Sequence, residues 1–248
     1  MAAMRPAIAI YLWIRFAIGA LLGLVIGVVV FPISWYRAAR AVHAEGVVCR
    51  AELIIDDPRA CRLAGPALVR LSGALERQAT TGCDVLGLEI RLQRTASDDA
   101  AQGDQDLLFG TFESFHTAAR DRAQTRSDDY LANRYSTVTR WWMPGHGPMI
   151  LRLLPPPPAP ADRGRDRVGR LTADLAAARA RFQLVATTRK GEIELGELRL
   201  LQRLAIDDRT LRTSMLRQGR GVRPLGVRNG IRLCVYPMSQ LARRLRGG

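Results

Sequence analysis

The sequence predicts an α+β protein, an antiparallel β-barrel with flanking helices that follows one N-terminal transmembrane helix. Three observations carry this prediction: an apolar run near the N-terminus, two groups of short strand-like segments, and a charged helical stretch between the groups. Closure into a barrel leaves no strand edge exposed, so two strand-rich halves favour it. The 248 residues suit an anchor over residues 1–37 and one folded domain over residues 38–248.

The apolar run covers residues 16–35, about 20 residues, which is enough to cross a hydrocarbon core of roughly 30 Å. Arg15 precedes it, and Trp13, Trp35 and Tyr36 stand where interfacial aromatic residues are expected. A signal peptide is the alternative, but its apolar region is normally shorter and no small-x-small cleavage site follows. We therefore expect a single-pass membrane protein.

Arginines around the run bear on its orientation. Two precede it and three follow it, namely Arg5 and Arg15, then Arg37, Arg40 and Arg50. The side that follows the run thus has one arginine more than the side that precedes it. By the positive-inside rule, this excess places the folded domain in the cytoplasm.

The net charge is +14, from 37 Lys and Arg against 23 Asp and Glu. Anionic headgroups are the partner that this excess favours beside a membrane segment, because no nucleic-acid motif accompanies it. A coding bias that replaces lysine by arginine remains an alternative. The four cysteines form no CxxC pair, so neither a zinc site nor a disulfide framework is predicted.

Alternation and turn residues give the order of elements behind the anchor. Strands are expected at residues 67–71, 86–92, 107–112, 182–187 and 197–201, and a hairpin at 139–142 and 149–154. Helices are expected at 115–135, 166–180 and 231–245. The adjacent Trp141 and Trp142 should face opposite sides of their strand. His116 is interpreted as solvated, and His146 as a turn residue without identified metal partners.

Four local patterns carry candidate chemistry. They are Arg40-x-x-His43-x-x-Gly46, then Arg70-x-Ser72, then Asp84-x-x-Gly87-x-x-x-Arg91, and finally Arg232-x-x-x-Tyr236-x-x-x-Gln240. In the last pattern the side chains share one helix face, because they are four residues apart. An adjacent guanidinium favours the phenolate form of a tyrosine, and a phenolate is an axial ligand suited to ferric haem.

In this order the four patterns resemble the signatures of the catalase-like superfamily, over about residues 38–246, and the short chain resembles its compact haem proteins. On the distal side, the resemblance implies that His43 is the catalytic histidine and that Ser72 hydrogen-bonds it. It also implies that Arg40 and Arg70 bind haem propionates.

On the proximal side, the resemblance implies haem b with its iron ligated by Tyr236. Arg232 would stand beside the phenolate, and Gln240 would continue the same cofactor-facing side of the helix.

One departure from the family concerns the distal asparagine. Where catalases carry it, this chain reads Phe-Gly-Thr-Phe-Glu, and Thr111 stands near its place. Since that asparagine orients peroxide, its loss weakens the prediction of fast hydrogen peroxide dismutation. We expect a peroxidase or catalase-related oxidoreductase acting on hydrogen peroxide or on organic hydroperoxides.

His43 lies about seven residues behind the apolar run, so it cannot lie far from the headgroups. This spacing favours lipid hydroperoxides drawn from the bilayer. The expected partners are lipids, the peroxide substrate, and further membrane subunits or copies of the chain, without nucleic acid. A non-catalytic, membrane-tethered binding or accessory subunit is the alternative function. A basic module for anionic lipid or nucleic acid is a third and weaker one.

Overall fold

The structure is a computed structural model that describes residues 6–37, 43, 46–74, 84–114, 116–160, 162–208 and 211–246. Its helices are α1 (Pro6–Arg37), α2 (Ala118–Gln124), α3 (Arg167–Ala176) and α4 (Val227–Leu245), with a short 3-10 helix η1 (Pro58–Leu63). Its strands are β1 (Gly46–Ile55), β2 (Gly65–Gly73), β3 (Leu86–Leu92), β4 (Gln105–Gly110), β5 (Tyr135–Ser136), β6 (Trp141–Met143), β7 (Gly147–Leu154), β8 (Arg181–Thr188), β9 (Gly191–Arg203) and β10 (Arg223–Pro224).

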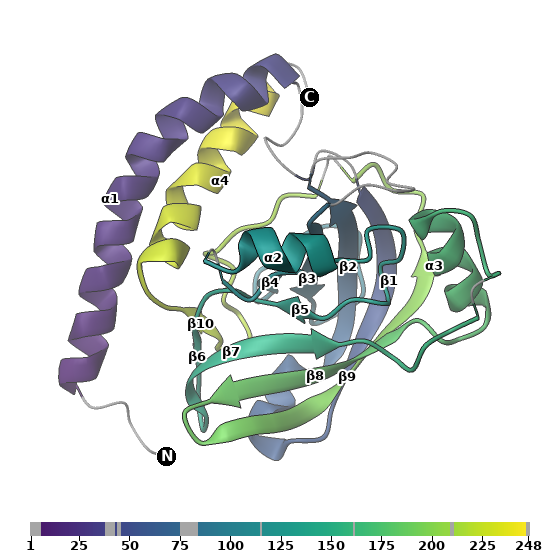
Figure 1. Cartoon of the computed structure of the whole chain (residues 1–248). Helices are drawn as coiled ribbons and strands as arrows, with labels where there is room; N and C mark the ends of the chain where they lie inside the picture. The colour runs from purple at the N-terminus through teal and green to yellow at the C-terminus, as the bar shows by residue number, and fades with distance from the viewer. Residues whose placement is uncertain are drawn as a thin grey trace.

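Eight of these strands close into an antiparallel barrel (Figure 1). The order around it is β7-β5-β4-β3-β2-β1-β9-β8, and β8 pairs with β7 to complete the ring. The short strands β6 and β10 continue the sheet from β7. The predicted α+β barrel with flanking helices is therefore confirmed, and closure leaves the eight strands without a free edge.

Apolar side chains fill the barrel. Leu71, Leu88 and Leu151 are fully buried, and the rings of Tyr135 and Phe182 meet edge to face with centroids 5.6 Å apart. Such pairs add to the stabilisation that comes from burial alone. The core therefore lies inside the barrel and is continuous with the surface on which α4 packs.

The expected and observed elements differ most at β1 and α2. Strand β1 is not among the expected strands, although Arg50 and Glu52 point away from the core while Ala51 and Leu53 point into it. The helix expected over residues 115–135 is limited to α2. Beyond α2, Asn133 exchanges two hydrogen bonds with the backbone of Arg126, and such side-chain bonds compete with helix formation.

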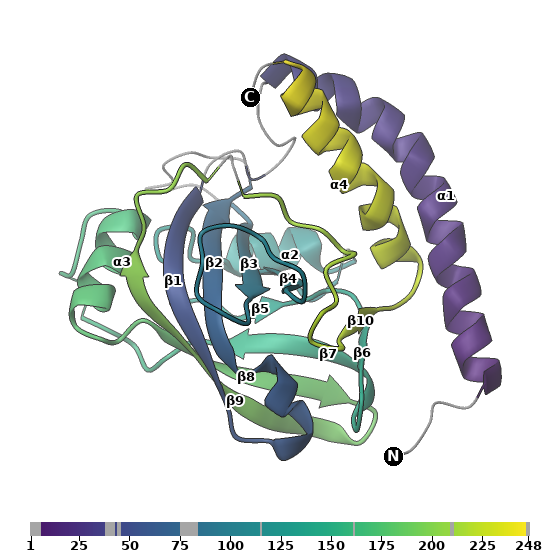
Figure 2. The ribbon, with the colours of Figure 1, turned by 180° about the vertical axis from the view of Figure 1, so that it is seen from behind.

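Helix α1 contains the run long and apolar enough to cross a membrane, residues 10–36 with mean hydropathy 2.7. A signal sequence would pass the same test of length and composition. The helix lies along α4, and α4 lies between α1 and the barrel (Figures 1 and 2). The expected anchor is thus in contact with the C-terminal helix of the folded domain.

Candidate functional site

His43 is held against the barrel by its backbone and its ring. Its N–H donates to the carbonyl of Ala74 at 3.1 Å, and its Nδ1 lies 3.0 Å from the hydroxyl of Ser72 on β2. The Ser72 hydroxyl is also 3.5 Å from the carbonyl of Gly87. If Nδ1 carries the proton, it donates to the Ser72 hydroxyl, which in turn donates to the carbonyl of Gly87. Nε2 is then the basic nitrogen of the ring.

Gly87 on β3 makes room for this imidazole. A Cβ at position 87 would lie 2.6 Å from Cε1 of His43 and 3.1 Å from Oγ of Ser72. Real side chains do not approach so closely, so a glycine is needed there. The structure thus brings together His43, Ser72 and Gly87 from three of the sequence patterns.

Arg70 supports His43 from the backbone side. Its guanidinium, 1% exposed, donates to the carbonyl of His43 at 2.7 Å, to Asp208 at 2.8 Å and to Glu89 at 3.1 Å. Two carboxylates therefore balance its charge. The contact with a haem propionate stays a prediction, and the observed role of Arg70 is to position His43.

Asp208 and Glu89 are the residues of this site that sequence reasoning missed. Asp208 is the second of two adjacent aspartates after β9, and it accepts a hydrogen bond from Arg70, 138 positions earlier in the chain. Glu89 faces outward from β3 between buried neighbours. A charged residue between apolar neighbours in a strand is the signal that points to a partner.

Thr111 follows β4 and is 7% exposed. Its hydroxyl oxygen accepts from the N–H of Leu86 at 3.1 Å and from the hydroxyl of Thr125 at 3.0 Å. It lines a cavity of about 300 Å³ beside α2. Thr111 is thus next to the strand that supports His43, and its contact with peroxide stays a prediction.

Helix α4 fixes the proximal residues. Tyr236 and Leu233 pack against the barrel core, Arg232 donates to the hydroxyl of Thr139 at 3.4 Å, and Gln240 donates to the carbonyl of Thr213 at 2.8 Å. Arg232, Tyr236 and Gln240 therefore share the barrel side of α4, as their spacing predicts. Arg40 lies outside the described residues.

The start of α4 is fixed by Asn229, which is completely buried. Its amide donates to the carbonyls of Arg140 and Leu225 at 3.0 and 3.2 Å, and its oxygen accepts from Thr139 at 3.0 Å. A buried amide with all of these bonds made holds the helix in one position on the barrel.

Two solved structures similar to this chain are catalases. The chain matches a fungal catalase with TM-score 0.58 and 13% identity, over 83% of this chain and 59% of the catalase. It matches a bacterial catalase with TM-score 0.54 and 12% identity, over 85% and 58%. The chain has a catalase-like fold. Identities this low show the fold alone, and the chain spans less than 60% of the length of these catalases.

Neither a protein-family model nor a curated protein matches the sequence. The assignment of a catalase-like fold therefore rests on the strand topology and on the agreement of the two structural comparisons.

A second cation–anion pair lies on the same outward face of β3 as Glu89. The Arg91 guanidinium is 3.1 Å from Asp106, which also accepts from Arg217 at 2.6 Å. Burial raises the pKa of Asp106, and the two arginines oppose that rise. Arg91, singled out in the third pattern, thus ties β3 to β4 and to the segment before α4.

The donor set fits haem in its chemistry. A phenol and an imidazole are donor types that suit haem iron, and here Tyr236 on α4 packs against the barrel core while His43 contacts Ser72. Within the described residues no group of three or more His, Cys, Asp or Glu side chains could hold a bare metal ion. The phenolic oxygen of Tyr236 is accordingly the candidate ligand for iron.

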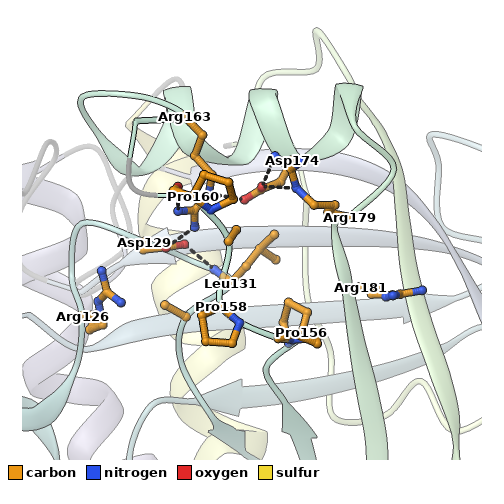
Figure 3. A pocket seen from close by; sticks show the side chains of 13 residues that line it. Arg126, Asp129, Leu131, Pro156, Pro158, Pro160, Arg163, Asp174, Arg179 and Arg181 are labelled. Carbon is orange, nitrogen blue, oxygen red and sulfur yellow. Dashed lines mark hydrogen bonds and ion pairs between the residues drawn. The ribbon is translucent and has the colours of Figure 1, made fainter.

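A separate cavity of about 190 Å³ lies beside α3 (Figure 3). Arg163 bridges Asp129 and Asp174 on one side of it, and Pro156 and Pro158 lie on the other side. Neither His43 nor Tyr236 lines this cavity or the one beside α2. These buried ion pairs lie beside α3 and are not part of the candidate site.

Proposed function

We propose that this protein is a haem-dependent oxidoreductase of the peroxidase or catalase-related type, acting at a membrane on hydrogen peroxide or on organic hydroperoxides. The observation that supports it most is the support of His43 by Ser72 and Gly87 in a barrel of catalase-like fold. An imidazole with a fixed proton on Nδ1 can accept a proton at Nε2, which is the task of a general base toward peroxide.

The roles of the residues follow from their positions. Haem b, when bound, supplies the redox chemistry of its iron, and Tyr236 would ligate that iron. His43 takes the peroxide proton and returns it to the departing oxygen, while Ser72 fixes the ring. Arg70 holds the His43 backbone, and Thr111 and Gln240 would line the cofactor side.

The observed partners of Arg70 alter one part of the proposal. Because Asp208 and Glu89 balance its charge, the haem propionates would depend on Arg40. The missing asparagine favours peroxidase turnover over rapid dismutation, and the apolar helix α1 favours hydroperoxides of lipids as substrates.

A non-catalytic accessory subunit is the second candidate. Two facts favour it: the chain spans less than 60% of the catalases it matches, and Thr111 replaces the distal asparagine. In this reading the barrel would bind a membrane partner without redox chemistry.

The deciding experiment is visible absorption of the detergent-purified protein after reconstitution with haem. We expect a Soret band with ferric-phenolate features that Tyr236→Phe loses or shifts and that the control Tyr36→Phe, at an exposed position, retains. The variant His43→Gln should keep the band but lose about 10²–10⁴-fold in hydroperoxide turnover. Wild-type protein that binds no stoichiometric haem would overturn the enzyme proposal in favour of the accessory subunit.

A further inference from the structure

The central part of α1 has the length of a bilayer core. Residues 16–34 carry no charge and lie between Tyr11 and Trp13 on one side and Trp35 and Tyr36 on the other. At 1.5 Å per residue this section is roughly 28 Å long. Taken as an isolated helix, α1 would cross the membrane.

Helix α4 lies in direct contact with this same section. A Cβ at Gly19 would lie 1.9 Å from the carbonyl oxygen of Val227, and a Cβ at Gly23 would lie 2.6 Å from that of Ile231. The backbones therefore touch, and no lipid chain fits between the helices.

Two further contacts extend this interface between α1 and α4, here called the seam, along both helices. A Cβ at Gly230 would lie 2.1 Å from the carbonyl oxygen of Phe16. Near the other end, the hydroxyls of Ser34 and Ser239 form a buried hydrogen bond of 2.7 Å. The contact thus runs over almost the whole apolar section.

This contact is incompatible with a crossing α1. Figures 1 and 2 show the barrel beside α1, and not beyond either of its ends. If α1 crossed the membrane, Arg228 and Arg232 of α4 would lie at the depth of the acyl chains, where a charged side chain is strongly unfavourable. The polar loops of the barrel would enter the bilayer as well.

The exposed apolar side chains of α1 lie on the face opposite α4. Leu21, Val25 and Val28 are 66–69% exposed, and on a helix they point away from Gly19, Gly23 and Gly27. Leu241 and Leu245 of α4 are exposed near the same end as Tyr36. The helix pair is thus amphipathic as a unit, with α1 as its apolar side and α4 as its polar side.

We propose that α1 lies along one lipid leaflet without crossing it, so that the protein is monotopic. Its outer face enters the acyl region, while α4 and the barrel stay in water on the same side as the N-terminus. The arginine excess would hold the barrel over anionic headgroups. This inference rests on the membrane association in the proposed function, but it does not depend on haem.

The first test maps the two ends of the full chain. Protein with an epitope tag at each end is bound to sealed vesicles of phosphatidylcholine and phosphatidylglycerol and treated with protease. We expect both tags to be digested together without detergent. Protection of one tag while the other is digested would show a crossing helix and overturn the proposal, as would failure of the protein to float with the vesicles.

The second test asks whether the helix pair persists on the membrane. A Cβ at Gly27 would lie 3.5 Å from Cβ of Met238, within disulfide geometry. In a background with Cys61, Cys83 and Cys234 replaced by serine, Gly27→Cys with Met238→Cys should cross-link on vesicles. The control Val28→Cys with Met238→Cys should not. A cross-link that forms in detergent but is lost on vesicles would mean that α1 leaves α4, and the proposal would fail. Neither test depends on bound haem, so the results of both can be interpreted even if haem reconstitution fails.

Discussion

His43 has a backbone φ of 59°, a conformation that residues other than glycine seldom adopt and that costs of order 1–3 kcal/mol. Its N–H is bound to Ala74 and its carbonyl to Arg70, so both backbone groups are fixed. The strain places the imidazole over Gly87 beside Ser72. A strained and fully bonded residue of this kind is typical of functional sites.

His146 is also placed by residues far from it in the chain. The sequence places it in a turn, and the structure places its side chain out of solvent, with Nε2 3.2 Å from the carboxylate of Asp57. Burial lowers the pKa of His146, Arg59 lowers it further, and Asp57 raises it in part. The folded protein therefore favours the neutral imidazole.

The lowered pKa of His146 predicts the direction in which stability changes with pH. Above the ordinary histidine pKa of 6.5 the imidazole is neutral in both states. Below it the unfolded chain takes up the proton first, so stability should fall as the pH drops from about 6.5. Urea unfolding of the wild type and His146→Gln at pH 7.5 and 5.5 measures the effect. We expect a smaller pH-dependent loss in the variant, and equal losses in both proteins would contradict the assignment.

At the scale of elements, α1 and α4 depend on glycines spaced four residues apart. We expect Gly23→Val to force the helices apart, because its side chain would meet the backbone of Ile231, at a cost of about 1–3 kcal/mol. Hydrogen exchange of the α4 amides should rise. The control Val25→Leu, on the exposed face, should leave exchange unchanged. Unaltered exchange in Gly23→Val would show that the seam does not hold α4.

Sequence patterns predicted the bounds of some elements accurately and those of others poorly. Strand β3 has the expected bounds, residues 86–92, because its apolar run is bounded by clear breaks. Strand β9 is much longer than the expected residues 197–201, since its outer half pairs with β8 through a register shift that no local pattern encodes. Trp141 is buried and Trp142 partly exposed, which confirms the expected alternation.

At the scale of the molecule, closure of the barrel depends on Gly196 of β9, where β9 lies very close to β1. Its φ is +153°, and a Cβ there would lie 2.0 Å from the carbonyl oxygen of Ile54 on β1. The register of β9 shifts on both of its neighbours, β1 and β8. This glycine lets two strands approach at a bend of the sheet.

We expect Gly196→Ala to destabilise the whole barrel, by about 3 kcal/mol or more, from strain and steric contact together. Gly191→Ala is the matched control, because Gly191 also has a positive φ but has nothing within 4 Å of the added Cβ. Thermal unfolding followed by near-ultraviolet circular dichroism compares them. Equal shifts of the midpoint would show that the contact with β1 does not limit closure.

The sequence by itself determined the features that depend on local order along the chain. These are the apolar helix, the barrel of short strands, and the common face of Arg232, Tyr236 and Gln240, because periodicity and residue type decide each of them within a few turns. The short spacing from the apolar run to His43 is of the same kind.

Only the tertiary structure decided the contacts between distant segments. It directed Arg70 toward Asp208, brought Asp57 to His146, and joined Ser34 to Ser239 across 205 positions. The physical reason is that a charge or hydroxyl removed from water takes whichever partner the fold brings near. For the same reason the contact of α1 with α4 is decided by the tertiary structure, and not by the hydropathy of α1.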